Sequence, residues 1–259
     1  MMDSDPNSML TVMTYCLAIK VNDGLILASD SRTNAGVDYV STYSKMHVFA
    51  KSGERFFVLL TAGNLATTQA VVNIIKRDLN NPHAEMSLNT VDYAFDAAHY
   101  IGSLNYQIQQ DYGEPLKQAG ASADASFILG GQIAGSPHEI YLIYPQGNYI
   151  AASPETCYLQ IGESKYGKPI LDRIITPDTP LEEAARCALV SLDSTMRANI
   201  SVGPPLELAF YRKDQLELER HVILESNSPL FRRIQNRWND GLRRAFKGLP
   251  RFEWEPKEN

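Results

Sequence analysis

The sequence predicts an α+β domain in which two groups of strands are stacked between two groups of helices. The expected elements run in the order strands, helices, strands, helices, strands, and no linker or change in composition divides residues 14–226. The chain has 259 residues, of which 44% are apolar and 21% charged. This length and composition allow a large buried core without disulfides or metals. We therefore expect one domain at 14–226, followed by a basic segment at 227–259.

Two hairpins are predicted at the start of the domain. The apolar run from Tyr15 to Ser29 is interrupted by Asn22-Asp23-Gly24, and Asp-Gly between strand-like runs is a strong hairpin signal. A second pair of runs, at 48–61, flanks the polar turn at 51–53. Further strands are expected at 125–129, 140–144, 149–152, 206–211 and 216–224.

Helices are predicted where apolar residues recur three and four positions apart. One covers 67–79, and Asn89 is expected to cap a longer one that ends near Asp111. Pro180, with Glu182 and Glu183 in the first turn, predicts the start of a helix at 181–197. A shorter helix is expected at 166–175.

Composition argues against several classes of protein. The apolar runs, such as Phe56–Leu60, reach only about five residues, whereas a membrane span needs about 20. The first 13 residues contain two aspartates and no Lys or Arg, so we expect no secretory signal. Three cysteines (Cys16, Cys157 and Cys187) fit a reducing, cytoplasmic compartment. No pair of histidines has ligand spacing, so we expect no metal and no other cofactor.

Charge is distributed unevenly along the chain. The net charge is −6, but the segment 232–251 carries +6 and the first 231 residues carry −10. An acidic body argues against nucleic acid as a partner. In the basic segment, one apolar stripe at helical spacing contains Phe231, Ile234, Trp238, Leu242, Ala245 and Leu249. We expect this helix to dock on its own body or on a neighbouring subunit rather than on a membrane.

Four residues with catalytic potential stand at the ends of predicted strands. Thr14 begins the first strand, Asp30 ends the first hairpin, Lys45 begins the next strand, and Gly63 follows the strand after it. This order resembles the proteasome-type β-subunits, and the stretch at 14–16 together with Ser29–Gly36 resembles their bacterial Anbu branch. The resemblance covers about 14–211.

The resemblance implies an Ntn-hydrolase fold, an αββα four-layer sandwich of two mostly antiparallel sheets. It implies threonine-type hydrolysis of peptide or amide bonds in a self-assembled, ring-like or helical homo-oligomer. The spacing from Thr14 to Asp30 is 16 residues, as in that family. The spacing from Thr14 to Lys45 is 31 residues, one fewer than usual, which implies a one-residue deletion in the intervening loop.

The chemistry of these residues is coherent without the resemblance. A threonine hydroxyl is a weak nucleophile until a base takes its proton, and the α-amine of Thr14 supplies that base if Thr14 is the first residue. The pKa of an α-amine is about 7.7–8.0, and a neighbouring lysine ammonium lowers it. Asp30 would hold Lys45. The N–H of Gly63 would bind the oxyanion, as the resemblance implies.

A second set of residues supports the first. The stretch Ile161–Gly167 resembles the family segment that supplies a serine near the amine, with Glu163 or Ser164 at that position. Asn199 and Ser201 stand where the family places an Asp and a Ser, so a carboxylate is absent at 199. Helix capping is the alternative role for Ser164 and Asn199. For Cys16, a small buried core residue is favoured over a reactive thiol.

The proposed chemistry needs a free amine on Thr14. Either translation begins at Met13 and the methionine is removed, which we favour, or residues 1–13 are a propeptide. Two other functions stay open: a dedicated amidase acting on a small or unusual amide, and a catalytically silent assembly subunit. Silent subunits of this family usually lose the Thr, Asp or Lys that this chain retains. The expected partner is a peptide or protein substrate, and an ATPase or operon partner is left open.

Overall fold

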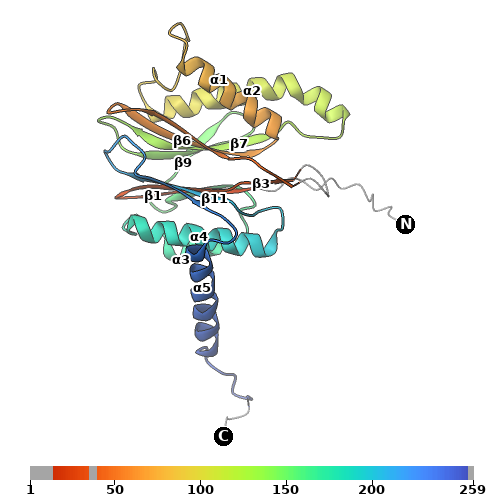
Figure 1. Ribbon diagram of the computed structural model, residues 1–259, viewed down its shortest axis with the longest axis vertical. Helices are drawn as coiled ribbons and strands as arrows, with labels where there is room; N and C mark the ends of the chain where they lie inside the picture. The colour runs from red at the N-terminus through yellow and green to blue at the C-terminus, as the bar shows by residue number, and fades with distance from the viewer. Residues whose placement is uncertain (1–13, 35–39, 256–259) are drawn as a thin grey trace.

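The computed structural model describes residues 14–34 and 40–255, and its strands form two five-stranded antiparallel sheets (Figure 1). The first sheet has the order β10 (Tyr158–Gly162), β1 (Tyr15–Val21), β2 (Gly24–Asp30), β11 (Leu206–Arg212) and β12 (Arg220–Leu224). The second has the order β5 (Met46–Lys51), β6 (Arg55–Gly63), β7 (Ala125–Ile133), β8 (Glu139–Ile143) and β9 (Tyr149–Ala151). Strands β3 (Arg32–Asn34) and β4 (Val40–Thr42) form a separate two-stranded ribbon.

Helices cover the outer face of each sheet. Helices α1 (Leu65–Leu79) and α2 (Ala94–Gln118) pack on the second sheet, and α3 (Lys168–Ile174) and α4 (Leu181–Ala198) pack on the first. Figure 1 shows the resulting order of layers: helices, sheet, sheet, helices. The predicted αββα sandwich is confirmed. Helix α5 (Pro229–Lys247) follows the last strand.

The core is divided by the two sheets into three apolar clusters. One lies between the first sheet and α3/α4, one between the second sheet and α1/α2, and one between the sheets. Alternation along β1 explains the division, because successive side chains point to opposite faces. Leu17 and Ile19 face the helices, whereas Cys16 and Ala18 face the second sheet.

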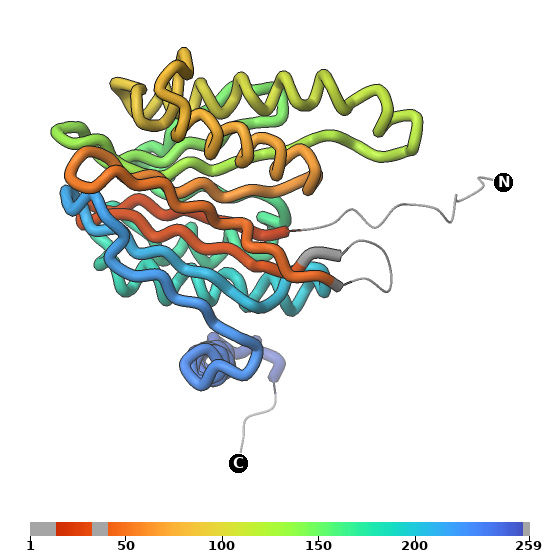
Figure 2. Tube along the Cα trace, turned by 45° about the horizontal axis from the view of Figure 1, so that its top comes forward, coloured from red at the N-terminus to blue at the C-terminus, as the bar shows by residue number. Residues whose placement is uncertain are grey.

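Both predicted hairpins are present. In the first, Val21 pairs with Gly24, and Figure 2 shows β1 and β2 side by side with β11 along the other edge of β2. Gly24 is required there, because a Cβ would lie 2.0 Å from the carbonyl oxygen of Tyr211. In the second hairpin, Lys51 pairs with Arg55 across the predicted turn.

The prediction that Asn89 caps the long helix was wrong. The helix begins at Ala94, and the carboxylate of Asp96 accepts a hydrogen bond from the N–H of Tyr93 (3.3 Å). Residues 87–90 close a separate turn, in which the N–H of Ser87 donates to Thr90 Oγ1 (3.0 Å). Asn89 is thus held in a turn before the helix, which continues past Asp111 to Gln118.

Four strands also differ from the prediction, and two of them, β3 and β4, were not predicted at all. β10 was likewise not predicted, although it pairs with β1 along its whole length. The last strand begins at Arg220 rather than Leu216. Asp214 and Leu216 have φ angles of 66° and 54°, which are incompatible with an extended strand. The side chain of Gln132 accepts a hydrogen bond from the N–H of Asp214 (2.9 Å) and holds this turn.

Helix α5 is the predicted basic amphipathic helix, and its first two turns dock on its own body. Phe231 is buried and Ile234 packs on the first core cluster. Gln235 donates to Asp193 Oδ1 on α4 (2.6 Å). Farther along, Leu242 and Phe246 are 49% and 74% exposed, and Figure 1 shows the helix leading away from α4. Among the described residues, no helix is long and apolar enough to cross a membrane.

Candidate functional site

Thr14 and Asp30 lie side by side at one end of the first sheet. Thr14 directly precedes β1 and Asp30 ends β2, and the antiparallel pairing of Cys16 with Ser29 brings these ends together. Thr14 Oγ1 donates to Asp30 Oδ1 (3.3 Å), and the N–H of Tyr15 donates to the same oxygen (3.1 Å). Both Thr14 and Asp30 are buried.

Lys45 reaches the same carboxylate from the second sheet. Its Nζ donates to Asp30 Oδ1 (2.7 Å) and to the carbonyl oxygen of Arg32 (2.6 Å). Burial raises the pKa of the Asp30 carboxyl, and the Lys45 ammonium is the largest influence against that rise. One oxygen of Asp30 therefore accepts from the candidate nucleophile and from the candidate ammonium group.

A loop after α4 closes the other side of Asp30. The N–H of Gly203 donates to Asp30 Oδ2 (3.2 Å), and Arg32 Nη1 donates to the carbonyl oxygen of Ile200 (2.7 Å). Arg32 thus bridges Lys45 to this loop. Sequence reasoning assigned no role to Arg32 or Gly203, although Arg32 lies inside the Ser29–Gly36 stretch and Gly203 lies two residues after Ser201.

Glu163, rather than Ser164, lies against Thr14. The N–H of Glu163 donates to the carbonyl oxygen of Thr14 (2.7 Å), whereas the N–H of Ser164 donates to the carbonyl oxygen of Gly162 (3.0 Å). Gly162 makes this approach feasible: its φ is +80°, and a Cβ would lie 1.9 Å from the Thr14 oxygen. Glu163 is also the more buried of the two candidates.

Asn199 joins Glu163 to the end of α4. Its Nδ2 donates to Glu163 Oε2 (3.3 Å), and its Oδ1 accepts from the N–H of Ser201 (2.9 Å). Its own N–H donates to the carbonyl oxygen of Thr195, so it also ends the helix. Asn199 is thus the C-cap residue of α4 through its backbone, while its side chain contacts Glu163 and the backbone of Ser201. Ser201 is buried beside it.

Gly63 ends β6 at the same end of the sandwich. The N–H of Thr61 donates to the carbonyl oxygen of Lys45 (3.0 Å), which places the end of β6 beside Lys45. Gly63 has a φ of +107°, and a Cβ would lie 2.3 Å from the carbonyl oxygen of Asp124. Only glycine fits this position without a shift of the backbone.

Cys16 is a core residue. It is fully buried, and its thiol donates to the carbonyl oxygen of Thr61 (3.6 Å) between the two sheets. Burial raises the pKa of the thiol, which keeps it protonated and unreactive. The expectation of a small buried residue is confirmed.

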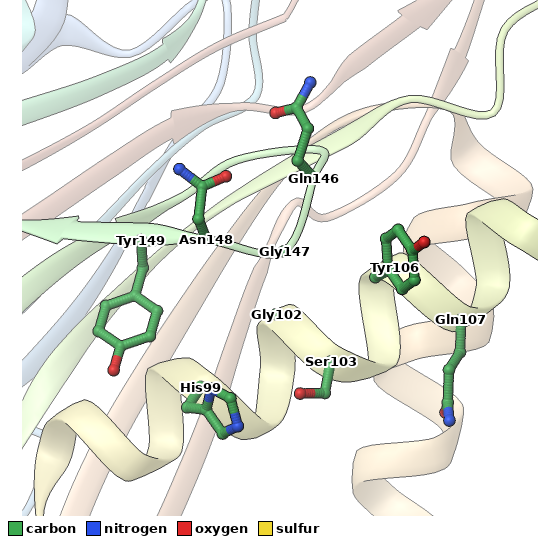
Figure 3. A pocket seen from close by; sticks show the side chains of 9 residues that line it. All are labelled: His99, Gly102, Ser103, Tyr106, Gln107, Gln146, Gly147, Asn148 and Tyr149. Carbon is green, nitrogen blue, oxygen red and sulfur yellow. The ribbon is translucent and has the colours of Figure 1, made fainter.

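A separate groove lies on the outer helix layer. It is formed where α2 meets the β8–β9 turn, and its lining includes His99, Tyr106, Asn148 and Tyr149 (Figure 3). Gly102 and Gly147 bring the two backbones together, since a Cβ on Gly102 would lie 2.0 Å from the Gly147 oxygen. None of the candidate catalytic residues lines this groove.

Comparison with known proteins identifies the family of this chain. The model of the proteasome subunit family matches residues 13–210. The chain belongs to the proteasome subunit family. It is 24% identical over 218 residues to a protein named proteasome subunit beta from Haloquadratum walsbyi, a match that covers 82% of this chain and 79% of that protein.

Solved structures place this proteasome-family chain with the Anbu branch. Anbu from Yersinia bercovieri is 42% identical with a TM-score of 0.87, covering 94% of this chain and 100% of that one. A structure described as the helical assembly of the Anbu complex from Pseudomonas aeruginosa is 45% identical with a TM-score of 0.87, covering 93% and 99%. The predicted branch is confirmed.

Proposed function

We propose that this proteasome-family chain hydrolyses peptide or amide bonds, with the Thr14 hydroxyl as nucleophile once Thr14 is the first residue. The observation that carries the proposal is the shared oxygen of Asp30, which lies 3.3 Å from Thr14 Oγ1 and 2.7 Å from Lys45 Nζ. This arrangement fits an activated nucleophile, because the charged group beside the hydroxyl is itself oriented by a third group, the Asp30 carboxylate. Residues 1–13 lie outside the described part of the chain, so their removal is part of the proposal.

The proposed reaction has two stages, acylation of Thr14 and hydrolysis of the resulting ester, and the Thr14 α-amine transfers the protons in both. Thr14 Oγ attacks the substrate carbonyl carbon while its proton passes to the Thr14 α-amine. The tetrahedral intermediate collapses, the C–N bond breaks, and the proton passes from the α-ammonium to the leaving amine, which leaves an ester on Thr14. Water then attacks the ester with the α-amine as base, releasing the acid and restoring the hydroxyl.

Each neighbouring group has a defined task in this scheme. Lys45 lowers the pKa of the Thr14 α-amine through its positive charge, so that more of the amine is neutral. Asp30 holds both Lys45 and the Thr14 hydroxyl in place. The N–H of Gly63 would stabilise the oxyanion, and its glycine backbone would let the substrate approach closely.

We further propose that the chain acts as a homo-oligomer in the cytoplasm. Self-association is supported by the helical assembly described for the Pseudomonas aeruginosa relative. It is also supported by the exposed apolar side chains on α5 beyond its contact with α4. All three cysteines are unpaired and buried, which fits a reducing compartment.

The N-terminus and the nucleophile can be tested together. The chain is expressed from Met13, and mass spectrometry shows whether its first residue is Thr14. It is then incubated with a panel of peptides and small amides, and with a peptide carrying a C-terminal vinyl sulfone. We expect turnover and an adduct on Thr14. A chain with a free Thr14 that shows neither would overturn the proposal in favour of a silent assembly subunit.

A further inference from the structure

We propose that Glu163 is the acidic partner of the Thr14 α-amine, which its carboxylate holds and orients as an ammonium group. This inference rests on the proposed function only in requiring that Thr14 become the first residue. It assigns Glu163 the role of a positioning residue, because it acts on the base rather than on the substrate.

Glu163 is a buried carboxylate that pairs with no cation in the part of the chain that the structure describes. It is 4% exposed, and no Lys, Arg or His of the described residues forms an ion pair with it. Its side chain accepts a hydrogen bond from the neutral amide of Asn199, whose Nδ2 lies 3.3 Å from Glu163 Oε2. Burying an ionised carboxylate is unfavourable unless a cation or several hydrogen bonds compensate it. A positive charge placed beside Glu163 would therefore stabilise its carboxylate.

Removal of the residues before Thr14 creates such a charge next to Glu163. The backbone N–H of Glu163 donates to the carbonyl oxygen of Thr14 (2.7 Å), so the two residues lie opposite each other on adjacent segments of the chain. Neighbouring strands are about 4.8 Å apart, a gap that a glutamate side chain can span. The nearby Lys45 ammonium already donates to Asp30 and to the Arg32 carbonyl. We therefore assign the new α-ammonium of Thr14, rather than Lys45, as the cation that pairs with Glu163.

Asn199 orients the carboxylate in this arrangement. Its Nδ2 donates to Oε2 of Glu163, while its own Oδ1 is fixed by the N–H of Ser201. One oxygen of Glu163 is thereby engaged, and the other is left for the amine. Sequence comparison alone suggested that the carboxylate is absent because position 199 is Asn. In the folded chain, the carboxylate is supplied by Glu163, which accepts a hydrogen bond from Asn199.

The proposal has a definite electrostatic consequence. A carboxylate favours the protonated amine and raises its pKa, whereas Lys45 lowers it. Replacing Glu163 by Gln keeps the shape and the contact with Asn199 but removes the charge. The pKa of the Thr14 α-amine should then fall by about one unit, a tenfold loss of proton affinity. If the enzyme turns over, the acidic limb of its pH–rate profile moves to lower pH by the same amount.

The experiment measures the amine directly. The chain beginning at Thr14 is labelled with trace acetic anhydride between pH 5 and pH 10, and mass spectrometry of the N-terminal peptide gives the pKa of the α-amine. Glu163→Gln is compared with Glu139→Gln, which neutralises a carboxylate paired with Lys20. We expect the fall in pKa in the first variant and an unchanged pKa in the second. An unchanged pKa in Glu163→Gln would overturn the proposal whether or not the protein hydrolyses anything.

Two further measurements separate charge from structure. In Glu163→Gln/Asn199→Asp the acid and the amide exchange places, and the pKa should return towards that of the unaltered chain. A pKa as low as that of Glu163→Gln would contradict the proposal. If Glu163→Gln does not fold, a crystal structure of the unaltered chain beginning at Thr14 decides. A carboxylate oxygen within hydrogen-bond distance of the Thr14 nitrogen is expected, and a separation beyond 4 Å excludes the contact.

Discussion

Lys45 Nζ and Asp30 Oδ1 lie 2.7 Å apart in a buried ion pair that joins the two sheets, because Lys45 directly precedes β5 and Asp30 ends β2. The pair therefore holds the sandwich together at the end where Thr14 stands. Removing one partner alone would leave an uncompensated buried charge, which typically costs several kcal/mol. Substitutions here must be judged by activity and by folding together.

Thr14→Ala should abolish hydrolysis and labelling by the vinyl sulfone peptide. The substitution removes the nucleophilic oxygen and one 3.3 Å hydrogen bond to Asp30, while the Lys45–Asp30 pair remains. The oligomer should stay intact, as light scattering would show. Undiminished hydrolysis in this variant would exclude Thr14 as the nucleophile.

Lys45→Ala should lower the rate by about 10²-fold or more, the usual scale for a group that supports proton transfer. Lys45→Arg should also fail, because the planar guanidinium cannot occupy the place of a compact ammonium that donates to Asp30 and to the Arg32 carbonyl. Steady-state rates, compared at equal amounts of folded protein, test both variants. Full activity with Arg would mean that Lys45 supplies only charge.

Local sequence signals predicted the elements whose geometry is fixed locally. The Asp23-Gly24 turn determines the first hairpin, and its register places Thr14 beside Asp30. The start of α2 was missed because competing turn hydrogen bonds at 87–90 displaced the expected cap at Asn89. β10 was missed because its partner β1 lies far away in the sequence, and edge pairing leaves no local turn signal.

The candidate site also combines features that could be predicted from the sequence with features that depend on the folded chain. The resemblance carried by Thr14, Asp30 and Lys45 implied that they meet, and the structure brings them together. The choice between Glu163 and Ser164 was not predictable, because it depends on the left-handed backbone of Gly162. The contact between Glu163 and Asn199 joins residues 36 apart and needs the folded position of α4.

The stability of the chain should depend on the protonation of His47. Burial, together with the nearby positive charge of Lys76, lowers the pKa of His47 to about 4, against an ordinary value near 6.5. The unfolded chain therefore binds a proton at a pH where the folded chain does not. The contribution of neutral His47 to the free energy of unfolding is complete above pH 6.5 and decreases as the pH drops towards 4. Urea midpoints at fixed protein concentration should fall less between pH 7 and pH 5 in His47→Gln. An equal fall in both proteins would exclude this role.

Gly162→Ala should destabilise the chain and disrupt the contact between Glu163 and Thr14. The added Cβ would lie 1.9 Å from the Thr14 oxygen, and the φ of +80° is also unfavourable for alanine. Gly135→Ala is the matched control: its φ is +77°, but a Cβ there meets nothing within 4 Å. We expect a loss of about 1–2 kcal/mol in the control from backbone conformation alone. The loss at Gly162 should be larger and accompanied by loss of Thr14 labelling. Equal losses in denaturant unfolding would mean that the contact with Thr14 has no energetic weight.

Truncation after Asn227 should shrink the oligomer while leaving the monomer folded. Helix α5 contacts its own body chiefly through Phe231, Ile234 and Gln235, so few intramolecular contacts are lost. Its farther part carries exposed Leu242 and Phe246, and a second copy of the acidic body would cover these apolar groups and pair with the basic ones.

Chromatography with light scattering gives the mass of the truncated chain. A chain truncated after Pro250 serves as the control, since it keeps the whole of α5 and should assemble normally. Neither the full chain nor the truncated one should bind vesicles of anionic lipid. An unchanged oligomer after removal of α5 would mean that the helix serves a partner other than a second copy, and vesicle binding lost on truncation would identify that partner as a membrane.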